Sequence, residues 1–298
     1  MPSLSKRALA MPASPLRKLA NIAADRKKQG VKVYHLNIGQ PDLKTPDEFF
    51  QVVRNFQDNP VEYAMSQGIE RTIDAWRGYY EKLGFHLERD ELMITTGGSE
   101  ALIFAMCTVA DPGENILVFE PFYTNYNGFG TLGGVQMKPV TLSIENGFHL
   151  PGDDDIRAAI DDKTRAMIIC NPSNPTGTVF SHDELVRLVA IAKEKDLFII
   201  SDEVYREFSF ESIAESMLSF SDVADRVIVC DSASKRFNAC GARIGALASK
   251  NKDVFATGVK YGMARLSVAT IEQEAIIPVI ERAQELIPPV VEEYRRRR

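Results

Sequence analysis

Short apolar runs, separated by amphipathic segments of helix length, dominate the middle of the chain. The runs at 116–120, 166–170, 197–201 and 227–231 are apolar at successive positions rather than at every second one. Strands of a parallel sheet that is covered on both faces show this pattern, because neither face meets water. The pattern predicts an α/β fold with a mostly parallel sheet and helices on both faces.

Helical periodicity separates these runs and also occurs near the N-terminus. The segment 181–196 opens with Ser181 and has Glu184 three residues later, which is the arrangement of a capping box. Residues 15–29, which include Leu16, repeat apolar side chains at helical spacing and end at a glycine. Residues 31–37 then alternate as a strand does. We therefore expect two helices and a strand in these segments.

Composition and charge narrow the class of protein. The chain has 298 residues, of which 45% are hydrophobic and 26% are charged, so a large core is expected. A net charge of −6 argues against nucleic acid as a partner. The first residues contain no apolar leader segment, and no apolar run approaches the roughly 20 residues of a membrane span. The four cysteines form no C-x-x-C pair, which favours reduced thiols and a cytoplasmic protein without a metal site.

Residues 128–133 read GFGTLG and so match the dinucleotide fingerprint formally, with Asp153 about 20 residues further on. The fingerprint requires an apolar strand before it and a helix that opens inside it. Here PFYTNYN precedes the motif and GGVQMKP follows it. We therefore do not expect nicotinamide or flavin binding from this motif.

A second glycine pair lies in the segment 95–100 (TTGGSE), between a strand-like LMIT and a helix-like EALIFAM. Free N–H groups at the start of such a helix point toward an anion. A plain strand-to-helix turn explains the segment equally well. The chain has no Walker A lysine pattern, so a phosphate bound here would not belong to a nucleoside triphosphate.

Three further polar segments follow predicted strands. They are Asn171–Gly177 (NPSNPTG), Ser201–Tyr205 (SDEVY) and Ser232–Lys235 (SASK), with Arg243 eight residues after the last. Ligands of open α/β sheets bind at the carboxyl ends of the strands. The three segments therefore predict one site at that edge.

With these motifs the sequence resembles the fold type I pyridoxal-phosphate-dependent aminotransferases of class I and II, the group that includes aspartate aminotransferases. The resemblance runs from LSKRALAMPASPLRKLA through LNIGQPDLKTP and EYAMSQGIERTIDAW to SASKRFNACGARIGALAS. Several motifs recur in order and at suitable intervals. The resemblance implies pyridoxal 5'-phosphate as the cofactor, and an amino acid and a 2-oxo acid as the substrates.

The resemblance also assigns the catalytic residues. Lys235 would form a Schiff base with the cofactor aldehyde and later carry a proton. Asp202 would pair with the protonated pyridine nitrogen, which makes the ring an electron sink. Tyr205 and Asn174 would hydrogen-bond the phenolic oxygen, and Asn174 would also contact the substrate.

The cofactor phosphate would lie at the start of the predicted helix. Backbone N–H groups of Gly98, Ser99 and Glu100, the hydroxyl of Ser232 and the guanidinium of Arg243 would surround it. A planar guanidinium binds phosphate oxygens through two hydrogen bonds and stays charged at physiological pH.

Three more positions match residues of the family. Tyr123 occupies the place of the aromatic ring that stacks on the pyridine, where many relatives carry Trp. Tyr63 resembles the tyrosine that reaches the neighbouring subunit's phosphate site, which implies a homodimer with a shared active site. Gly39 matches a glycine whose backbone approaches the substrate carboxylate. We expect Arg265 to lie at the surface.

The same resemblance suggests a domain organisation. Residues 1–45 would form an N-terminal arm and part of a small domain, 46–270 the large cofactor-binding domain, and 271–298 an interdomain helix. The family's arginine for the substrate carboxylate lies in a C-terminal small domain that has no counterpart here, so the chain is expected to be truncated. An aminotransferase is the leading hypothesis. A lyase or decarboxylase on the same fold, or an inactive truncated dimerisation partner, remain alternatives.

Overall fold

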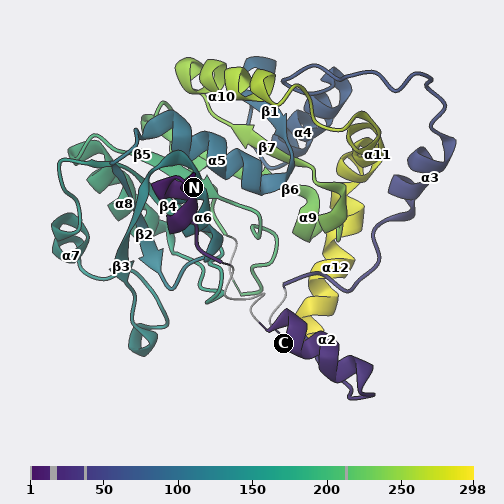
Figure 1. Ribbon diagram of the computed structural model, residues 1–298. Coiled ribbons are helices and arrows are strands. Elements are labelled where there is room, and N and C mark those ends of the chain that lie inside the picture. The colour runs from purple at the N-terminus through teal and green to yellow at the C-terminus, as the bar shows by residue number, and fades with distance from the viewer. Residues whose placement is uncertain (1, 14–18, 37–38, 212–213) are drawn as a thin grey trace.

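The apolar runs of the sequence are the strands of one mixed sheet. The computed structural model describes residues 2–13, 19–36, 39–211 and 214–298. Within these ranges seven strands pair in the order β1-β7-β6-β5-β4-β2-β3 (Figure 1). Neighbours from β6 to β3 are parallel, whereas β7 runs antiparallel to both β1 and β6. The strands are β1 (Leu92–Thr95), β2 (Asn115–Glu120), β3 (Gln136–Thr141), β4 (Thr164–Cys170), β5 (Phe198–Asp202), β6 (Val227–Ser232) and β7 (Gly245–Ala248).

Helices cover the sheet on both faces. The α-helices among the described residues are α1 (Lys6–Ala10), α2 (Ala20–Lys28), α3 (Asp47–Asn55), α4 (Glu70–Lys82), α5 (Gly97–Val109), α6 (Asn125–Gly133), α7 (Asp153–Ala158), α8 (His182–Glu194), α9 (Ala233–Arg236), α10 (Lys252–Ala264), α11 (Thr270–Glu281) and α12 (Ala283–Arg297). The capping box predicted for α8 is present, because Ser181 and Glu184 each accept a backbone N–H from the other.

Two hydrophobic cores lie on opposite faces of the sheet. Along β2, Ile116 and Val118 belong to the core that includes α5, whereas Leu117 and Phe119 belong to the core that includes α4 and α8. Side chains alternate between the two faces of a strand, so a run that is apolar throughout serves both cores. The predicted sheet, mostly parallel and covered on both faces, is therefore confirmed.

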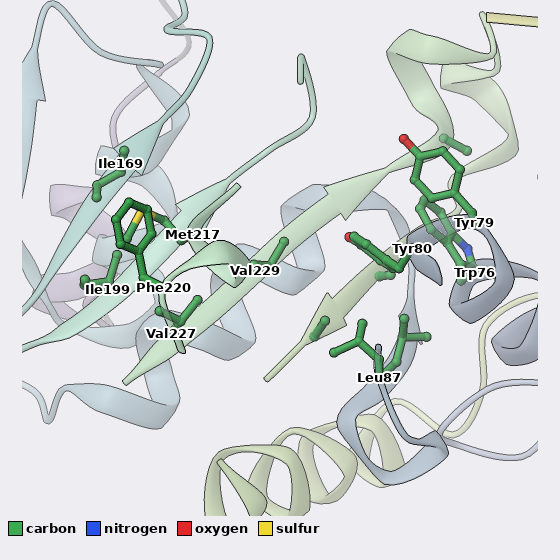
Figure 2. Close-up of a cluster of buried hydrophobic side chains, with 14 of the residues drawn as sticks. Trp76, Tyr79, Tyr80, Leu87, Ile169, Ile199, Met217, Phe220, Val227 and Val229 are labelled. Carbon is green, nitrogen blue, oxygen red and sulfur yellow. The ribbon is translucent and has the colours of Figure 1, made fainter. Parts of the chain in front are cut away.

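Aromatic residues of α4 fill the core on one side of the sheet. Trp76, Tyr79 and Tyr80 are nearly or fully buried, and Figure 2 shows them together on one helix, across from Val227 and Val229 of β6. The rings of Trp76 and Tyr79 meet edge to face with centroids 6.0 Å apart. These contacts bury one face of α4 against the sheet.

The N-terminal segment differs in part from the prediction. The helix expected over residues 15–29 is observed as α2, and Leu16 lies outside the described residues. The strand expected over 31–37 is wrong for residues 31–36, which pair with no other strand, and Asn37 lies outside the described residues. Leu36 is 96% exposed. Alternation alone does not make a strand, because a strand needs a neighbour for its hydrogen bonds.

The C-terminal segment is helical, as expected, in spite of its prolines. It forms α11 and α12, with Pro278 inside the first helix and Pro288 and Pro289 inside the second. α11 packs on α3 and α4, and the buried amide of Gln273 accepts the N–H of Ile69 at 2.8 Å. Among the residues that the structure describes, no helix is long and apolar enough to cross a bilayer.

The formal dinucleotide fingerprint has no phosphate-binding geometry. Residues 128–133 lie inside α6 rather than in a turn that joins a strand to a helix. A Cβ at Gly130 would lie 2.6 Å from the carbonyl oxygen of Val135, so the glycine serves close packing of the chain. Gly130 therefore has a structural use in this motif.

Candidate active site

The carboxyl ends of β4, β5 and β6 bring the predicted polar segments together. In the sheet register Asp202 lies opposite Cys170 of β4 on one side and Cys230 of β6 on the other. The loop that contains Asn174 follows β4, and α9 with Lys235 follows β6 directly. One edge of the sheet thus carries all three segments.

Lys235 lies in the single turn of α9 and is partly exposed. Its Nζ donates a hydrogen bond to the carbonyl oxygen of Gly39 at 2.5 Å and lies 5.8 Å from the ring centroid of Tyr205. A Cβ built on Gly39 would be 4.0 Å from the Tyr205 hydroxyl. The structure therefore brings Gly39, Tyr205 and Lys235 together although they are distant in sequence.

Asp202 is a buried carboxylate at the end of β5, with 5% of the residue exposed. Burial raises its pKa to about 6, although a hydrogen bond from the Tyr126 hydroxyl at 2.7 Å to its Oδ2 opposes this shift. The backbone N–H of Val204 donates to the other oxygen at 3.4 Å. A cation beside Asp202 would favour the ionised form, so the site suits a positively charged group.

Tyr205 lies close to this carboxylate, and Asn174 lies in the loop after β4. Burial raises the pKa of the Tyr205 phenol, and the ionisable groups of Cys170 and Asp202 raise it further. The backbone of Asn174 interacts with the thiol of Cys170. Asn171, the other asparagine of the loop, uses its side chain to accept the N–H of Phe180 at 3.0 Å. Asn171 thus holds the loop in place, while Asn174 lies half-buried beside Cys170.

The start of α5 meets the ends of β6 and β7. Gly245 pairs with Thr95 on one side and with Ser232 on the other. A Cβ at Gly98 would lie 3.5 Å from the Cβ of Ser232. The first N–H groups of an α-helix have no partner within the helix, and the helix dipole adds partial positive charge there. Gly98, Ser99 and Glu100 therefore present backbone donors beside Ser232.

Arg243 adds a guanidinium to the same place. Its Nη2 donates to the carbonyl oxygen of Thr96 at 3.3 Å, and its Nη1 donates to that of Cys240 at 3.1 Å. Gly97 has a φ of +73°, and a Cβ there would lie 2.5 Å from Nη2. Glycine thus permits both the backbone turn and the approach of the guanidinium.

The side chains of Glu100 and Ser232 already have protein partners. Oε2 of Glu100 accepts the N–H of Thr96 at 2.8 Å, so only the backbone of Glu100 is directed to a ligand. The Ser232 hydroxyl lies 2.8 Å from the Ser234 hydroxyl and 3.2 Å from the carbonyl oxygen of Ile244. A role for Ser232 in anion binding would use the same hydroxyl.

Arg265 is not a simple surface residue, contrary to expectation. Its side chain is only 17% exposed, and its Nε donates to both carboxylate oxygens of Glu100 at 3.1 and 3.2 Å. Its Nη2 donates to the carbonyl oxygen of Ile94 at 3.0 Å. Arg265 therefore ties α10 to the start of α5 and to β1.

The two remaining tyrosines lie in different settings. Tyr123 packs edge to face on Tyr126, with centroids 5.5 Å apart, so it lies close to the residue that bonds Asp202. Tyr63 is 81% exposed and lies on the segment between α3 and α4. The structure brings Tyr123 to the site and leaves Tyr63 outside it within one chain.

The donor set fits pyridoxal phosphate. It combines one amine, one buried carboxylate that forms no ion pair with any cation of the described residues, a tyrosine beside the amine, and backbone and guanidinium donors for a phosphate. Sequence reasoning missed Tyr126 and Gly97. Tyr126 gave no signal because the segment PFYTNYN has neither the pattern of an apolar strand nor that of a helix start, whereas Gly97 stands in the glycine pair that the sequence does show. Among the described residues, no group of three or more His, Cys, Asp or Glu side chains is arranged to hold a metal ion.

The family of the chain follows from comparison with known proteins. Residues 31–298 match the family model described as aminotransferase class I and II. The chain belongs to this family and is an aminotransferase. Its motifs, its fold and the polar edge of its sheet agree with that assignment.

Relatives and solved structures show the extent of the similarity. The aspartate aminotransferase of Thermotoga maritima is 29% identical over 93% of this chain and 74% of that protein. The structure of the Thermus thermophilus aspartate aminotransferase with maleate matches with a TM-score of 0.92 at 28% identity, over 100% of this chain and 78% of that one. The alanine aminotransferase of Pyrococcus furiosus matches with a TM-score of 0.91 at 28% identity, over 99% and 77%. The chain thus spans about three quarters of the length of these proteins.

Proposed function

We propose that the chain is a pyridoxal-phosphate-dependent aminotransferase that binds its cofactor covalently through Lys235. The observation that supports this most strongly is the position of Lys235 Nζ beside Gly39 and Tyr205, at the sheet edge where Asp202 is buried. When bound, the cofactor supplies a conjugated ring that accepts the electron pair of the α C–H bond of an amino acid. The protein residues bind and orient the reactants and move protons.

Each side chain of the proposed site has a separate task. Lys235 Nζ would first hold the cofactor aldehyde and then, once displaced by substrate, move the proton from the α-carbon. Asp202 would keep the pyridine nitrogen protonated, because a buried carboxylate is stabilised by an adjacent cation. Tyr205 and Asn174 would donate to the phenolic oxygen, and Tyr123 would cover the ring face.

The phosphate would be held at the start of α5. Backbone donors of Gly98, Ser99 and Glu100 face an anion there, with Arg243 and Ser232 beside them. The backbone of Gly39 would approach the substrate carboxylate. These assignments rest on the match of motifs and on the arrangement described above.

The oligomeric state belongs to the same proposal. Tyr63 is 81% exposed, and Val61 and Met65 beside it are 56% and 74% exposed. A second copy of the chain would bury these three exposed side chains, and Tyr63 would reach the phosphate site of that copy. We therefore propose a homodimer with shared active sites.

The domain organisation and location are also proposals. Residues 1–45 would form an N-terminal arm and part of a small domain, 46–270 the large domain, and 271–298 the interdomain helices. The sheet lies wholly within the second range, which supports this division. The four cysteines are free among the described residues, as a cytoplasmic location would require.

Absorbance spectroscopy tests the reaction directly. The purified protein, loaded with pyridoxal phosphate, is mixed in turn with acidic, neutral and aromatic L-amino acids. At least one should convert the cofactor to its amine form and yield the matching 2-oxo acid, and a 2-oxo acid should reverse the change. No conversion with any amino acid, or release of CO2 or ammonia without the 2-oxo acid, would contradict the proposal.

A further inference from the structure

Five buried charged side chains form a network directly behind the proposed site. The buried charge network consists of Glu203, Arg206, Glu207, Asp231 and Arg236, and each side chain is at most 13% exposed. Four of its members are chain neighbours of site residues. Glu203 follows Asp202, Arg206 follows Tyr205, Asp231 precedes Ser232 and Arg236 follows Lys235.

Arg236 makes the most varied contacts in the buried charge network. Its Nη2 donates to Asp231 and, at 3.3 Å, to the carbonyl oxygen of Glu203. Its Nη1 donates to the Tyr79 hydroxyl at 2.7 Å, and its Nε lies 3.1 Å from Glu207 Oε2. The side chain is fully buried. One guanidinium thus joins the ends of β5 and β6 to α4, whose Tyr79 is drawn in Figure 2.

The charge of Arg236 is maintained by its neighbours. Burial alone would lower its pKa, but the Asp231 and Glu207 carboxylates outweigh burial and raise the pKa above its usual value. A fixed planar fork can hold several acceptors at once, which an ammonium group on a flexible stem cannot do equally well. Arg236→Lys would therefore keep the charge and lose part of the geometry.

α9 needs such an anchor because it is only four residues long. One turn of helix has almost no stability of its own, so its position depends on tertiary contacts. Lys235 and Arg236 are consecutive in this turn. Nζ of Lys235 reaches Gly39 and Tyr205, whereas the guanidinium of Arg236 reaches the core side of the sheet. A shift of Arg236 would move Lys235 with it.

We propose that Arg236 is a positioning residue that fixes α9 so that Lys235 Nζ meets the cofactor aldehyde. The inference rests on the proposed function. It predicts that Arg236 acts on the cofactor through Lys235 and not through general stability. The energetic effects of changing the two residues should therefore be coupled.

A double-mutant cycle on cofactor affinity tests this coupling. The dissociation constant of pyridoxal phosphate is measured by equilibrium dialysis for the wild type, Arg236→Lys, Lys235→Ala and the double variant. Arg236→Lys should weaken binding about tenfold when Lys235 is present and less than about twofold in the Lys235→Ala background. Equal effects with and without Lys235 would overturn this inference but not the proposed function.

Arg206→Lys provides a matched control. Arg206 is 7% exposed and also contacts Glu203, Glu207 and the Tyr79 hydroxyl, but it does not belong to α9. Arg206→Lys should lower the stability measured by thermal unfolding as much as Arg236→Lys does. It should change cofactor affinity equally with and without Lys235. Coupling to Lys235 as large as that of Arg236 would contradict the specific role of Arg236.

A gentler variant keeps the test decisive if Arg236→Lys does not fold. Tyr79→Phe removes a single hydroxyl, which accepts from Arg236 Nη1 and from Arg206 Nη2 and donates to Glu207. Its effect on cofactor affinity should be about threefold with Lys235 and absent without it. Equal effects in both backgrounds would again overturn the inference. A wild type that binds no pyridoxal phosphate would overturn the proposed function together with the inference.

Discussion

Asp202 lowers the stability of the cofactor-free protein and at the same time suits the proposed function. Its carboxylate is buried at the end of β5 and accepts hydrogen bonds from Tyr126 and from the backbone of Val204, and among the described residues no cationic side chain forms an ion pair with it. Burial without a cation disfavours the charged form. The protein therefore carries a cost at this position that a protonated ring nitrogen would relieve.

Replacing Asp202 by Asn should stabilise the cofactor-free protein at neutral pH. The pKa of Asp202 rises from 3.8 to about 6 on folding, mainly through burial. Between about pH 4 and pH 6 the unfolded chain loses this proton while the folded protein keeps it, so the free energy of unfolding falls as pH rises. The full cost above pH 6 is about 3 kcal/mol. Asp202→Asn should thus gain up to about this amount at pH 7.5 and about a third of it at pH 4.5.

Denaturant unfolding at both pH values measures this difference. Asp222→Asn is the control, because Asp222 is exposed and pairs with Lys193 at the surface. It should change the free energy of unfolding only slightly. A stability difference between Asp202→Asn and the wild type that does not grow with pH would contradict the account.

At the scale of elements, the contact of α5 with β6 and β7 builds the proposed phosphate site. It depends on a glycine at the start of β7. A Cβ at Gly245 would lie 2.6 to 2.7 Å from backbone atoms of Asp231, Gly97 and Gly98. Backbone atoms cannot turn aside as a long side chain can. The close approach therefore excludes any larger residue without a shift of the elements.

Gly245→Ala should destabilise the protein and weaken cofactor binding. Overpacking of this kind costs about 1–3 kcal/mol, and the shift of α5 moves its N–H donors away from the phosphate. Gly241→Ala is the matched control, because Gly241 is exposed and has no atom within 4 Å of a built Cβ. Thermal unfolding and equilibrium dialysis with pyridoxal phosphate measure both effects. Equal losses of stability and of cofactor affinity in the two variants would contradict the role given to the close approach at Gly245.

The strength of the sequence signal differed among the elements. The strands β2, β4, β5 and β6 were predictable because both of their faces are buried and therefore apolar. The strand β3 was not, since it lies at the sheet edge with mostly exposed or partly exposed side chains. The alternation at 31–36 was misleading, because a local pattern does not show whether a partner strand exists.

The residues of the proposed site also differ in how well the sequence predicts their positions. Asp202 and Lys235 follow apolar strands in recognisable motifs, so their position at the sheet edge could be predicted. Arg206 and Arg236 could not be placed, because isolated arginines are usually exposed. Only the fold brings three carboxylates around them. Tyr63 and its role remain predictions.

At the scale of the whole molecule, the proposed homodimer would complete each active site with Tyr63 of the other chain, and Tyr63 is 81% exposed in one chain. In the proposed homodimer, the site that contains one chain's Lys235 also contains the Tyr63 of the partner. In a hybrid dimer, one chain carries a defect in Tyr63 and the other a defect in Lys235. Both defects then fall in the same active site, which leaves the second site intact.

Hybrid dimers should therefore recover activity. Tyr63→Ala and Lys235→Ala homodimers should each be strongly impaired. Co-expression of the two variants should restore about a quarter of wild-type activity, since half of the dimers would be hybrids with one intact site of two. Transamination is measured by 2-oxo acid formation in purified mixtures. No recovery in hybrids that are confirmed by mass would contradict a shared site.

The covalent link at Lys235 is the central claim, and chemical trapping tests it most directly. The protein is incubated with pyridoxal phosphate, reduced with borohydride, digested and analysed by mass spectrometry. The account predicts a pyridoxyl phosphate adduct on the peptide that contains Lys235, and none there in Lys235→Ala, although that variant keeps its fold. A protein that carries no adduct, or carries it at wild-type level on other lysines of Lys235→Ala, would contradict the account.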